Sequence, residues 1–246
     1  MNIVWENLKF FVTCLKNLPV SKNLILENNK GFCVSTGCDF ESWVFYPEKI
    51  NSYEVVEDVI KFFQDNKISF VWPLYDDGEK FLERAGLIYA GDLTAMSFEP
   101  GKNSYNGHDE KILIKRCNDH KIFAQTVWQG FNGEINEIPE KYFAFIEALN
   151  NYTKNFSLYI AEYENQNVGT FLITHGENLT GVYYFATLPK FRRKGVARAM
   201  MKKICELSIG KKIVLQATPS GLNFYKNFGF EKLFNIPVYS NETDVF

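Results

Sequence analysis

The chain has 246 residues, of which 46% are hydrophobic and 16% aromatic, enough for a sizeable core in one large or two small domains. Its formal net charge of −2 excludes the general basic surface of a nucleic-acid-binding protein. No apolar run reaches the ~18 residues that span a bilayer, and the first residues, MNIVWENLKFF, lack the basic segment of a signal peptide. We therefore expect a cytoplasmic protein with neither a nucleic acid nor a membrane as partner.

The five cysteines are scattered along the sequence and are odd in number. Cys33 and Cys38 are close to each other, but no second pair of ligands has the spacing of a zinc site. We expect free thiols in a reducing compartment and no bound metal.

Two stretches of the first half have the same order of elements as two stretches of the second half. Each pair consists of a strand, a turn and a helix, and the paired ranges are 43–63 with 183–204 and 67–87 with 212–230. We interpret the first half as a degenerate repeat of the second. Chance similarity between two αβ units is the alternative, because such units share their turn residues.

The two copies differ where the second one is most basic. When Pro47 is aligned with Pro189, Tyr53 takes the position of Gly195, and the arginine cluster of the second copy has no counterpart in the first. A bulky tyrosine without nearby positive charge is unsuited to hold a diphosphate. The first copy therefore lacks this chemistry.

The boundary between the halves is expected in GKNSYNGHDE, residues 101–110, where glycine, asparagine, serine and charged residues gather between apolar stretches. We predict an N-terminal domain at 1–103, closed by a strand ending at Phe98, and a second domain at 108–246.

The second half alternates strands and helices in an α+β order. Asn118 or Asp119 can cap its first helix, and Pro139 suits the start of the next one. Residues 164–167, ENQN, are a hairpin turn. The predicted elements are a strand at 111–116, helices at 118–130 and 139–149, strands at 156–163, 168–175 and 180–187, a helix at 195–208, a strand at 211–217, a helix at 220–227 and a last strand pair.

A basic turn, RRKGVA at Arg192–Ala197, joins the strand-like run GVYYFATLP to the helix-like segment VARAMMKKICEL. The first N–H groups of a helix have no partner inside it, and the helix dipole adds positive charge there. Gly195 lets the backbone approach a ligand closely. The turn is therefore a candidate diphosphate site, and a merely solvated basic turn is the alternative.

A second segment, IVLQATPSGLNFYKNFGF at 213–230, gives a strand, a turn, a short helix containing Tyr225 and a Gly229-Phe230 step. Together the two segments resemble the GNAT superfamily of acyl-CoA N-acyltransferases, whose pattern is Q/R-x-x-G-x-G/A followed later by a helical tyrosine ahead of Gly-Phe. The resemblance covers about residues 111–240. It implies the GNAT fold, a mostly antiparallel mixed sheet flanked by helices, preceded here by a smaller degenerate GNAT-like domain.

The resemblance also implies roles for residues of the second half. Backbone groups of Phe185, Ala186 and Thr187 would bind the pantetheine arm of acetyl-CoA, and Tyr225 would protonate the leaving thiolate as general acid. Asn223 would contact the pantetheine arm, although the family's usual asparagine falls nearer Thr218 and Ser220. The diphosphate would be held by the turn, that is by Arg192, Arg193, Lys194, Gly195, Val196, Ala197 and Arg198.

The acceptor side is expected in the segment 128–139, WQGFNGEINEIP. Trp128 and Phe131 would form its walls, and Glu134 or Glu137 would attract an amine. Alternatively, the aromatic residues only fill the junction of the two halves. The general base is not identified, with Glu162, Glu134 and Glu137 as the candidates.

These features predict an N-acetyltransferase that transfers an acetyl group from acetyl-CoA to a primary amine of a small molecule, as a monomer or homodimer. A non-catalytic acyl-CoA-binding or regulatory module is the alternative. Aminoacyl transfer from a charged tRNA, which some two-copy relatives perform, is disfavoured by the near-neutral charge.

Overall fold

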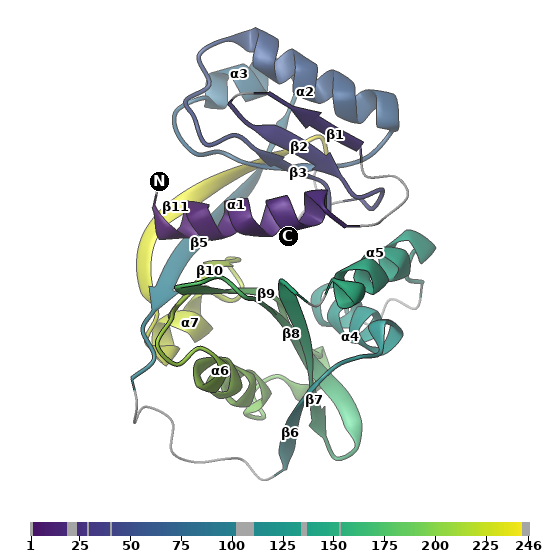
Figure 1. The fold of residues 1–246 in the computed structure, drawn as a ribbon, viewed down its shortest axis with the longest axis vertical. Coiled ribbons are helices and arrows are strands. Elements are labelled where there is room, and N and C mark those ends of the chain that lie inside the picture. Colours follow the sequence, from purple (N-terminus) through teal and green to yellow (C-terminus); the bar gives the residue numbers. More distant parts are fainter. Residues whose placement is uncertain are drawn as a thin grey trace. The chain divides into compact units, whose positions relative to one another are not determined.

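The computed structural model describes residues 2–18, 24–28, 30–39, 41–101, 111–133, 137–152 and 154–242. The chain forms two compact units (Figure 1): unit 1 comprises Met1–Met96 and Gln216–Phe246, and unit 2 comprises Ser97–Leu215. The C-terminal segment thus folds with the N-terminal half. The expected linker lies from residue 102 onward outside the described residues, and the division into domains at 1–103 and 108–246 stays a prediction.

Unit 1 contains a mixed sheet to which both ends of the sequence contribute. The spatial order is β1 (Leu24–Glu27), β2 (Phe32–Ser35), β3 (Trp43–Phe45), β4 (Val71–Pro73), β11 (Glu231–Ser240) and β5 (Ile88–Phe98). Strands β1 to β3 are antiparallel, β4 is parallel to β3, and β11 is antiparallel to β4.

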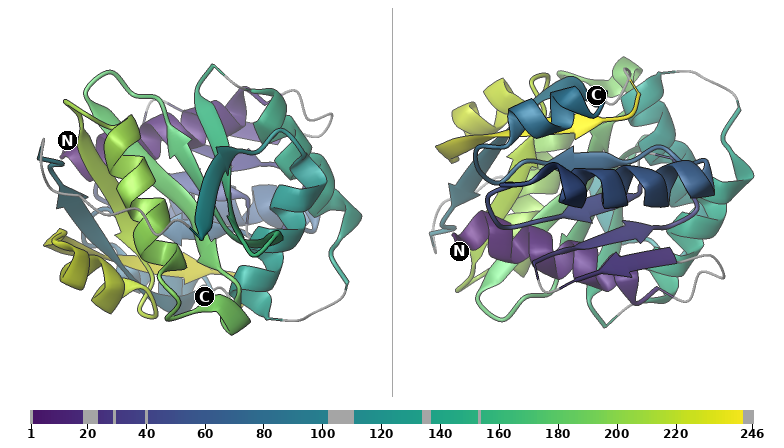
Figure 2. Two further views of the ribbon diagram at one scale, coloured as in Figure 1. Left: turned by 90° about the horizontal axis from the view of Figure 1, so that it is seen from below. Right: turned by 90° about the horizontal axis from the view of Figure 1, so that it is seen from above.

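Helices α1 (Ile3–Lys16) and α2 (Tyr53–Asn66) lie on opposite faces of this sheet (Figures 1 and 2), and the short α3 (Glu79–Arg84) lies beside α2. Successive residues of β3 point to opposite faces, as in any strand. Trp43 therefore packs edge-on against Phe11 of α1 at 6.0 Å between centroids, whereas Val44 joins the core that includes Phe63 of α2.

The C-terminal end forms one strand rather than the expected pair. β11 runs through Pro237 without a break. The proline lacks an N–H, but its carbonyl accepts a hydrogen bond from the Leu74 amide at 2.8 Å, so the missing donor does not disrupt this side of the strand.

Unit 2 contains a sheet with one parallel and three antiparallel pairings. The order is β10 (Lys212–Ala217), β9 (Leu179–Thr187), β8 (Gln166–Thr174), β7 (Phe156–Tyr163) and β6 (Ile112–Arg116), with β10 parallel to β9. The β7–β8 hairpin turns at Glu164 and Asn165, both at positive φ, which two-residue hairpin turns favour. The predicted ENQN turn is confirmed.

Helices cover this sheet. Asp119 caps α4 (His120–Asn132) by accepting from the amides of Lys121 and Ile122, as expected. α5 (Glu140–Asn151) packs on α4, while α6 (Val196–Leu207) packs on β8 and β6. The single 3-10 turn η1 (Pro189–Phe191) precedes α6, and α7 (Leu222–Phe228) belongs to unit 1.

Helix α4 extends two residues beyond its expected end at Gly130 and stops before Gly133, whose φ is 75°. Gly130 lies inside the helix, at a point where strand β9 leaves no room for a side chain. A Cβ at this position would lie 2.6 Å from the Cβ of Ala186 in β9. Gly133, and not Gly130, is therefore the glycine at the end of this helix.

The α+β class, with mostly antiparallel mixed sheets flanked by helices, is confirmed. Among the described helices, none has both the length and the apolar character required to cross a membrane.

Candidate functional site

The N-terminus of α6 is a helix end whose amide groups are left available. Gly195 is its N-cap residue at φ 84° and ψ −10°, and no side chain caps the helix. Arg193 also has positive φ, 65°, so the turn bends twice in three residues. The N–H groups of Val196, Ala197 and Arg198 have no acceptor inside the helix. The arrangement suits an anion, as the basic turn predicted.

The basic side chains around this turn divide into two kinds. Arg193, Lys194 and Arg198 are exposed, and Lys194 Nζ lies 5.0 Å from the centre of the Phe191 ring. These three side chains surround the helix end with positive charge. They are available to a diphosphate.

Arg192 differs, because its guanidinium forms hydrogen bonds within the protein. Its Nη2 donates to the carbonyl oxygen of Gly130 at 2.9 Å, and its Nε donates to that of Thr187 at 3.4 Å. The side chain therefore connects the turn with the end of α4 and the end of β9. Nothing in the sequence signals a bond across 62 positions.

A β-bulge lies in β9, three residues before the strand ends. Thr170 of β8 pairs with Ala186 and Leu172 pairs with Tyr183, so Phe171 alone faces two residues of β9. Tyr184 takes φ 49°, and the Thr170 hydroxyl donates to its carbonyl at 2.9 Å. Bulges of this kind re-aim backbone groups beside binding sites.

The last residues of β9 extend past its pairing with β10. The last residue pair between the two parallel strands is Val214 with Gly181, whereas β9 continues to Thr187. Ala186 is buried beneath α4, and the Thr187 hydroxyl is buried with no hydrogen-bond partner among the described residues. A buried hydroxyl without a partner is costly, so Thr187 fits a polar ligand on this segment.

Tyr225 occupies the middle of α7 in unit 1. The helix ends at Gly229 with φ 114°, and the amides of Gly229 and Phe230 both donate to the Tyr225 carbonyl. The ring packs edge-on against Phe230 with centroids 5.5 Å apart. Burial raises the pKa of the Tyr225 phenol above its usual value, so the phenol is protonated at neutral pH.

Asn223 lies on the first turn of α7, exposed. Just before it, the hydroxyls of Thr218 and Ser220 are hydrogen-bonded to each other at 3.0 Å. The role of Asn223 as a pantetheine ligand stays a prediction.

The acceptor segment begins inside α4 rather than in a loop. Trp128 packs edge-on against Tyr142 of α5 at 5.0 Å between centroids, and its indole N–H is buried without a partner among the described residues. Phe131, one turn later, is 56% exposed. Glu134 lies outside the described residues.

A cavity of about 540 Å³ opens beside this segment in unit 2. The walls consist of apolar side chains with one carboxylate and one amide, contributed by Gln125, Glu137, Ile138, Pro139 and Phe143. Of the candidate bases, Glu137 lines the cavity, whereas Glu162 forms an ion pair with Lys115 on the neighbouring strand.

Comparison with known proteins gives this arrangement a family. A family model described as an acetyltransferase (GNAT) domain matches residues 154–232, which include the basic turn, α6 and α7. Residues 154–232 belong to the GNAT acetyltransferase family. Among curated proteins, no relative is found.

Solved structures show that the GNAT fold extends over most of the chain. A GCN5-related N-acetyltransferase from Kribbella flavida matches with a TM-score of 0.67 and 14% identity over 98% of this chain and 96% of that one. A functionally unknown conserved protein from Staphylococcus epidermidis matches with a TM-score of 0.65 and 11% identity, covering 93% and 97%. A tandem GNAT protein from the clavulanic acid biosynthesis pathway matches at 0.60 and 7% identity, covering 94% and 86%.

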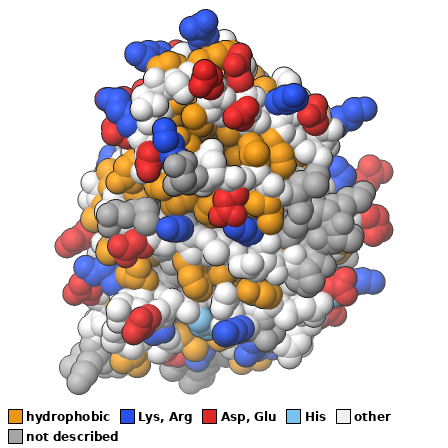
Figure 3. Space-filling view, turned by 45° about the horizontal axis from the view of Figure 1, so that its top comes forward, with side chains coloured by type: hydrophobic (Ala, Val, Ile, Leu, Met, Phe, Trp, Pro, Cys, Tyr) orange, Lys and Arg blue, Asp and Glu red, His pale blue; other side chains and the backbone are white. Residues whose placement is uncertain are grey.

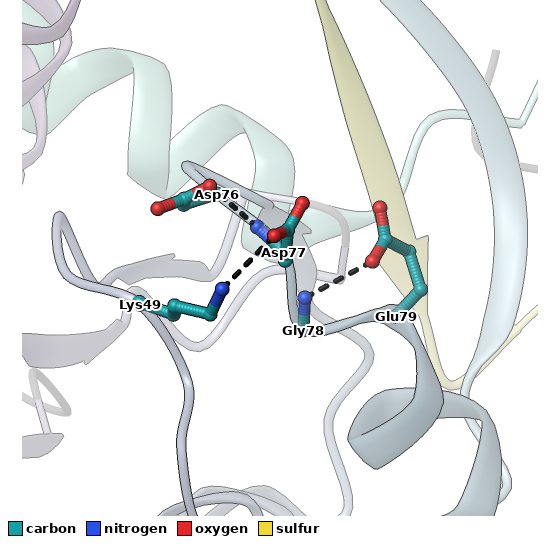
Figure 4. A network of polar contacts seen from close by, with 5 residues as sticks. All are labelled: Lys49, Asp76, Asp77, Gly78 and Glu79. Carbon is teal, nitrogen blue, oxygen red and sulfur yellow. Dashed lines mark hydrogen bonds and ion pairs between the residues drawn. The ribbon is translucent and has the colours of Figure 1, made fainter.

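The GNAT-like first half carries acidic residues just ahead of α3, a position that corresponds to the segment before α7 in the second half. In the loop before α3, Lys49 donates to Asp77 at 2.9 Å, while Asp76 and Glu79 accept from the backbone amides of Asp77 and Gly78 (Figure 4). The amides of Asp77 and Gly78 are thus bonded to carboxylates. At the start of α2, which corresponds to the basic turn, Tyr53 stands in the place of Gly195 and the arginine cluster is missing.

Within the described ranges, no three His, Cys, Asp or Glu side chains gather as metal ligands. All five cysteines are buried and outside any disulfide among the described residues, and burial raises the pKa of the Cys33 and Cys117 thiols.

Proposed function

We propose that the protein is an N-acetyltransferase that transfers the acetyl group of acetyl-CoA to a primary amine of a small molecule. The observation that carries this proposal is the uncapped N-terminus of α6 at Gly195, which follows β9 directly and is surrounded by exposed basic side chains. The GNAT match over residues 154–232 supports the reaction class.

The coenzyme would lie along the end of β9 and the turn. The amides of residues 195–198 would bind the diphosphate, helped by Arg193, Lys194 and Arg198. The backbone of Phe185, Ala186 and Thr187 would bind the amide-rich pantetheine arm in the manner of an added strand. The Thr187 hydroxyl, which is buried without a described partner, would gain one.

In the transfer, the neutral amine nitrogen attacks the thioester carbonyl carbon, a C–N bond forms and the C–S bond breaks. The nitrogen loses one proton to solvent water, and the leaving thiolate takes one proton from Tyr225, which solvent then reprotonates. Burial raises the pKa of the Tyr225 phenol, so it is protonated before this step. Most of the rate would come from holding amine and thioester together and from backbone donors on β9 that polarise the carbonyl.

The acceptor would enter beside α4 and α5. The 540 Å³ cavity has the size of a small-molecule site, and Glu137 at its edge would attract a protonated amine before it loses its proton. Trp128 and Phe131 lie on the same helix as Gln125 of this cavity, and Glu134 stays in the proposal as a residue of the adjoining segment.

A second class of function, a non-catalytic acyl-CoA-binding module, shares the turn but needs no general acid. Aminoacyl transfer from tRNA finds little support, since acidic and basic side chains are interspersed on the face shown in Figure 3. The near-zero net charge agrees with this.

Thiol release from acetyl-CoA with a panel of small amines tests the proposal. Tyr225→Phe should lower kcat by about 10²–10³-fold with little change in coenzyme affinity, as expected for a lost general acid. Tyr89→Phe, which removes an exposed phenol elsewhere in unit 1, is the matched control and should retain full turnover. Coenzyme binding without turnover for any amine would favour the binding module.

A further inference from the structure

The guanidinium of Arg192 is placed as a C-terminal cap of α4. The Gly130 carbonyl is one of the last four of that helix, which have no amide partner within it. Arg192 Nη2 donates to this carbonyl at 2.9 Å. A cation at the negative end of a helix dipole is favourable, so this contact stabilises the end of α4 where it is.

The position of that helix end matters for both substrates. Gly130 approaches β9 so closely that an added Cβ would meet the Cβ of Ala186, and its next residues lead into the segment of Phe131 and Glu137. The same guanidinium donates to the Thr187 carbonyl, at 3.4 Å. One side chain therefore connects the coenzyme turn, the coenzyme strand and the acceptor segment.

We propose that Arg192 is a positioning residue that couples the coenzyme turn to the acceptor segment, rather than a ligand of the diphosphate. This inference rests on the proposed function. Coenzyme bound at the turn fixes the Arg192 backbone, and the side chain transmits this order to the end of α4. The acceptor amine then binds more tightly to the protein–coenzyme complex than to the free protein.

Lysine at this position separates the two roles. Arg192→Lys keeps a positive charge beside the turn, but an ammonium group lacks the planar fork that reaches two carbonyls at once. If Arg192 binds the diphosphate as a positive charge, lysine can take over this role. If Arg192 bridges the two carbonyls, lysine cannot. Arg116→Lys, an exposed arginine of β6, is the matched control for the substitution itself.

Amide hydrogen exchange with and without coenzyme A, together with calorimetric binding, tests the coupling. Coenzyme A should slow exchange of the amides of residues 129–133 at least about fivefold in the wild type and in Arg116→Lys, the lower range of measured couplings. Arg192→Lys should bind coenzyme A within about threefold of the wild type without this slowing. Its KM for the amine should rise about tenfold with kcat little changed, since hydrogen bonds to charged groups are worth such factors.

Two results would overturn the inference, and they are distinguishable. If coenzyme A slows amide exchange at residues 129–133 in Arg192→Lys as much as in the wild type, the side chain is not a bridge. The same holds if the variant loses more than tenfold in coenzyme affinity. In both cases the proposed function still stands. If wild-type protein fails to bind coenzyme A, the proposed function fails with it. Arg192→Gln, which retains a neutral donor for Gly130, serves the same comparison should the lysine variant fold poorly.

Discussion

Gly130 of α4 lies against Ala186 of β9 at a separation that leaves no room for a side chain on the glycine, because an added Cβ would stand 2.6 Å from the alanine Cβ. Contacts between carbon atoms are optimal near 3.5–4.0 Å. Helix α4 and strand β9 therefore meet at a point where a larger side chain on Gly130 must move one of them.

The first prediction concerns this contact. Gly130→Ala should destabilise the protein by about 1–3 kcal/mol through overpacking, although alanine in a helix is ordinarily better than glycine by about 1 kcal/mol. Urea unfolding measures it. In the Gly130→Ala/Ala186→Gly double variant the loss should be smaller than the sum of the single losses. Stabilisation by Gly130→Ala alone would contradict the prediction, because it would show that α4 can move away from β9 at little cost in free energy.

Gly195 and Gly210 provide a matched pair. Both have positive φ, 84° and 79°, and a Cβ at Gly210 would meet nothing within 4 Å. Each change to alanine should cost about 1–2 kcal/mol in the free energy of unfolding, the price of a left-handed non-glycine residue. Only Gly195→Ala should also weaken coenzyme A binding, by about tenfold or more, as read by calorimetry. Equal coenzyme affinity in the two variants would remove the turn from the site.

Thr187 and Thr170 differ in the partners of their hydroxyls. The Thr170 hydroxyl donates to the Tyr184 carbonyl at 2.9 Å, whereas that of Thr187 has no partner among the described residues. Thr170→Val should therefore cost about 1 kcal/mol of stability or more. Thr187→Val should leave thermal stability unchanged or raised and lower coenzyme A affinity. Thermal unfolding and calorimetry on both variants check this, and unchanged affinity in Thr187→Val would exclude the hydroxyl as a ligand.

His175 predicts a small pH dependence of stability. Its Nε2 is hydrogen-bonded to Ser157 Oγ at 2.7 Å, and burial, followed by the charges of Lys211 and Arg116, lowers the pKa of the imidazole below its usual value of about 6.5. The unfolded chain then binds more protons than the folded one as pH falls through about 6.5, so stability decreases in that direction. The urea midpoint should fall between pH 7.5 and 5.5, and less so in His175→Gln. An equal fall in both proteins would contradict the assignment.

Local signals in the sequence predicted much of this fold. Asp119 was recognisable as a helix cap by its type and position, and the hairpin at Glu164 and Asn165 by its polar turn between alternating strands. The turn at Gly195 was visible because strand, glycine and helix follow one another directly. Each of these features depends on neighbours within a few residues.

Features that depend on distant partners were not predictable in this way. Gly130 read as a helix end because its contact with Ala186 is tertiary. The bulge at Tyr184 has no glycine to mark its positive φ. The hydrogen bond of the Arg192 guanidinium could not be expected, because its partner Gly130 is remote in sequence.

Calorimetric titration of the wild-type protein with coenzyme A tests the central claim most directly. The account predicts a single site per chain with a dissociation constant below about 1 mM, the upper range of enzyme substrates, and a loss of affinity on Gly195→Ala that Gly210→Ala does not show. Absence of binding at millimolar coenzyme, or a second equal site in the first half, would contradict it.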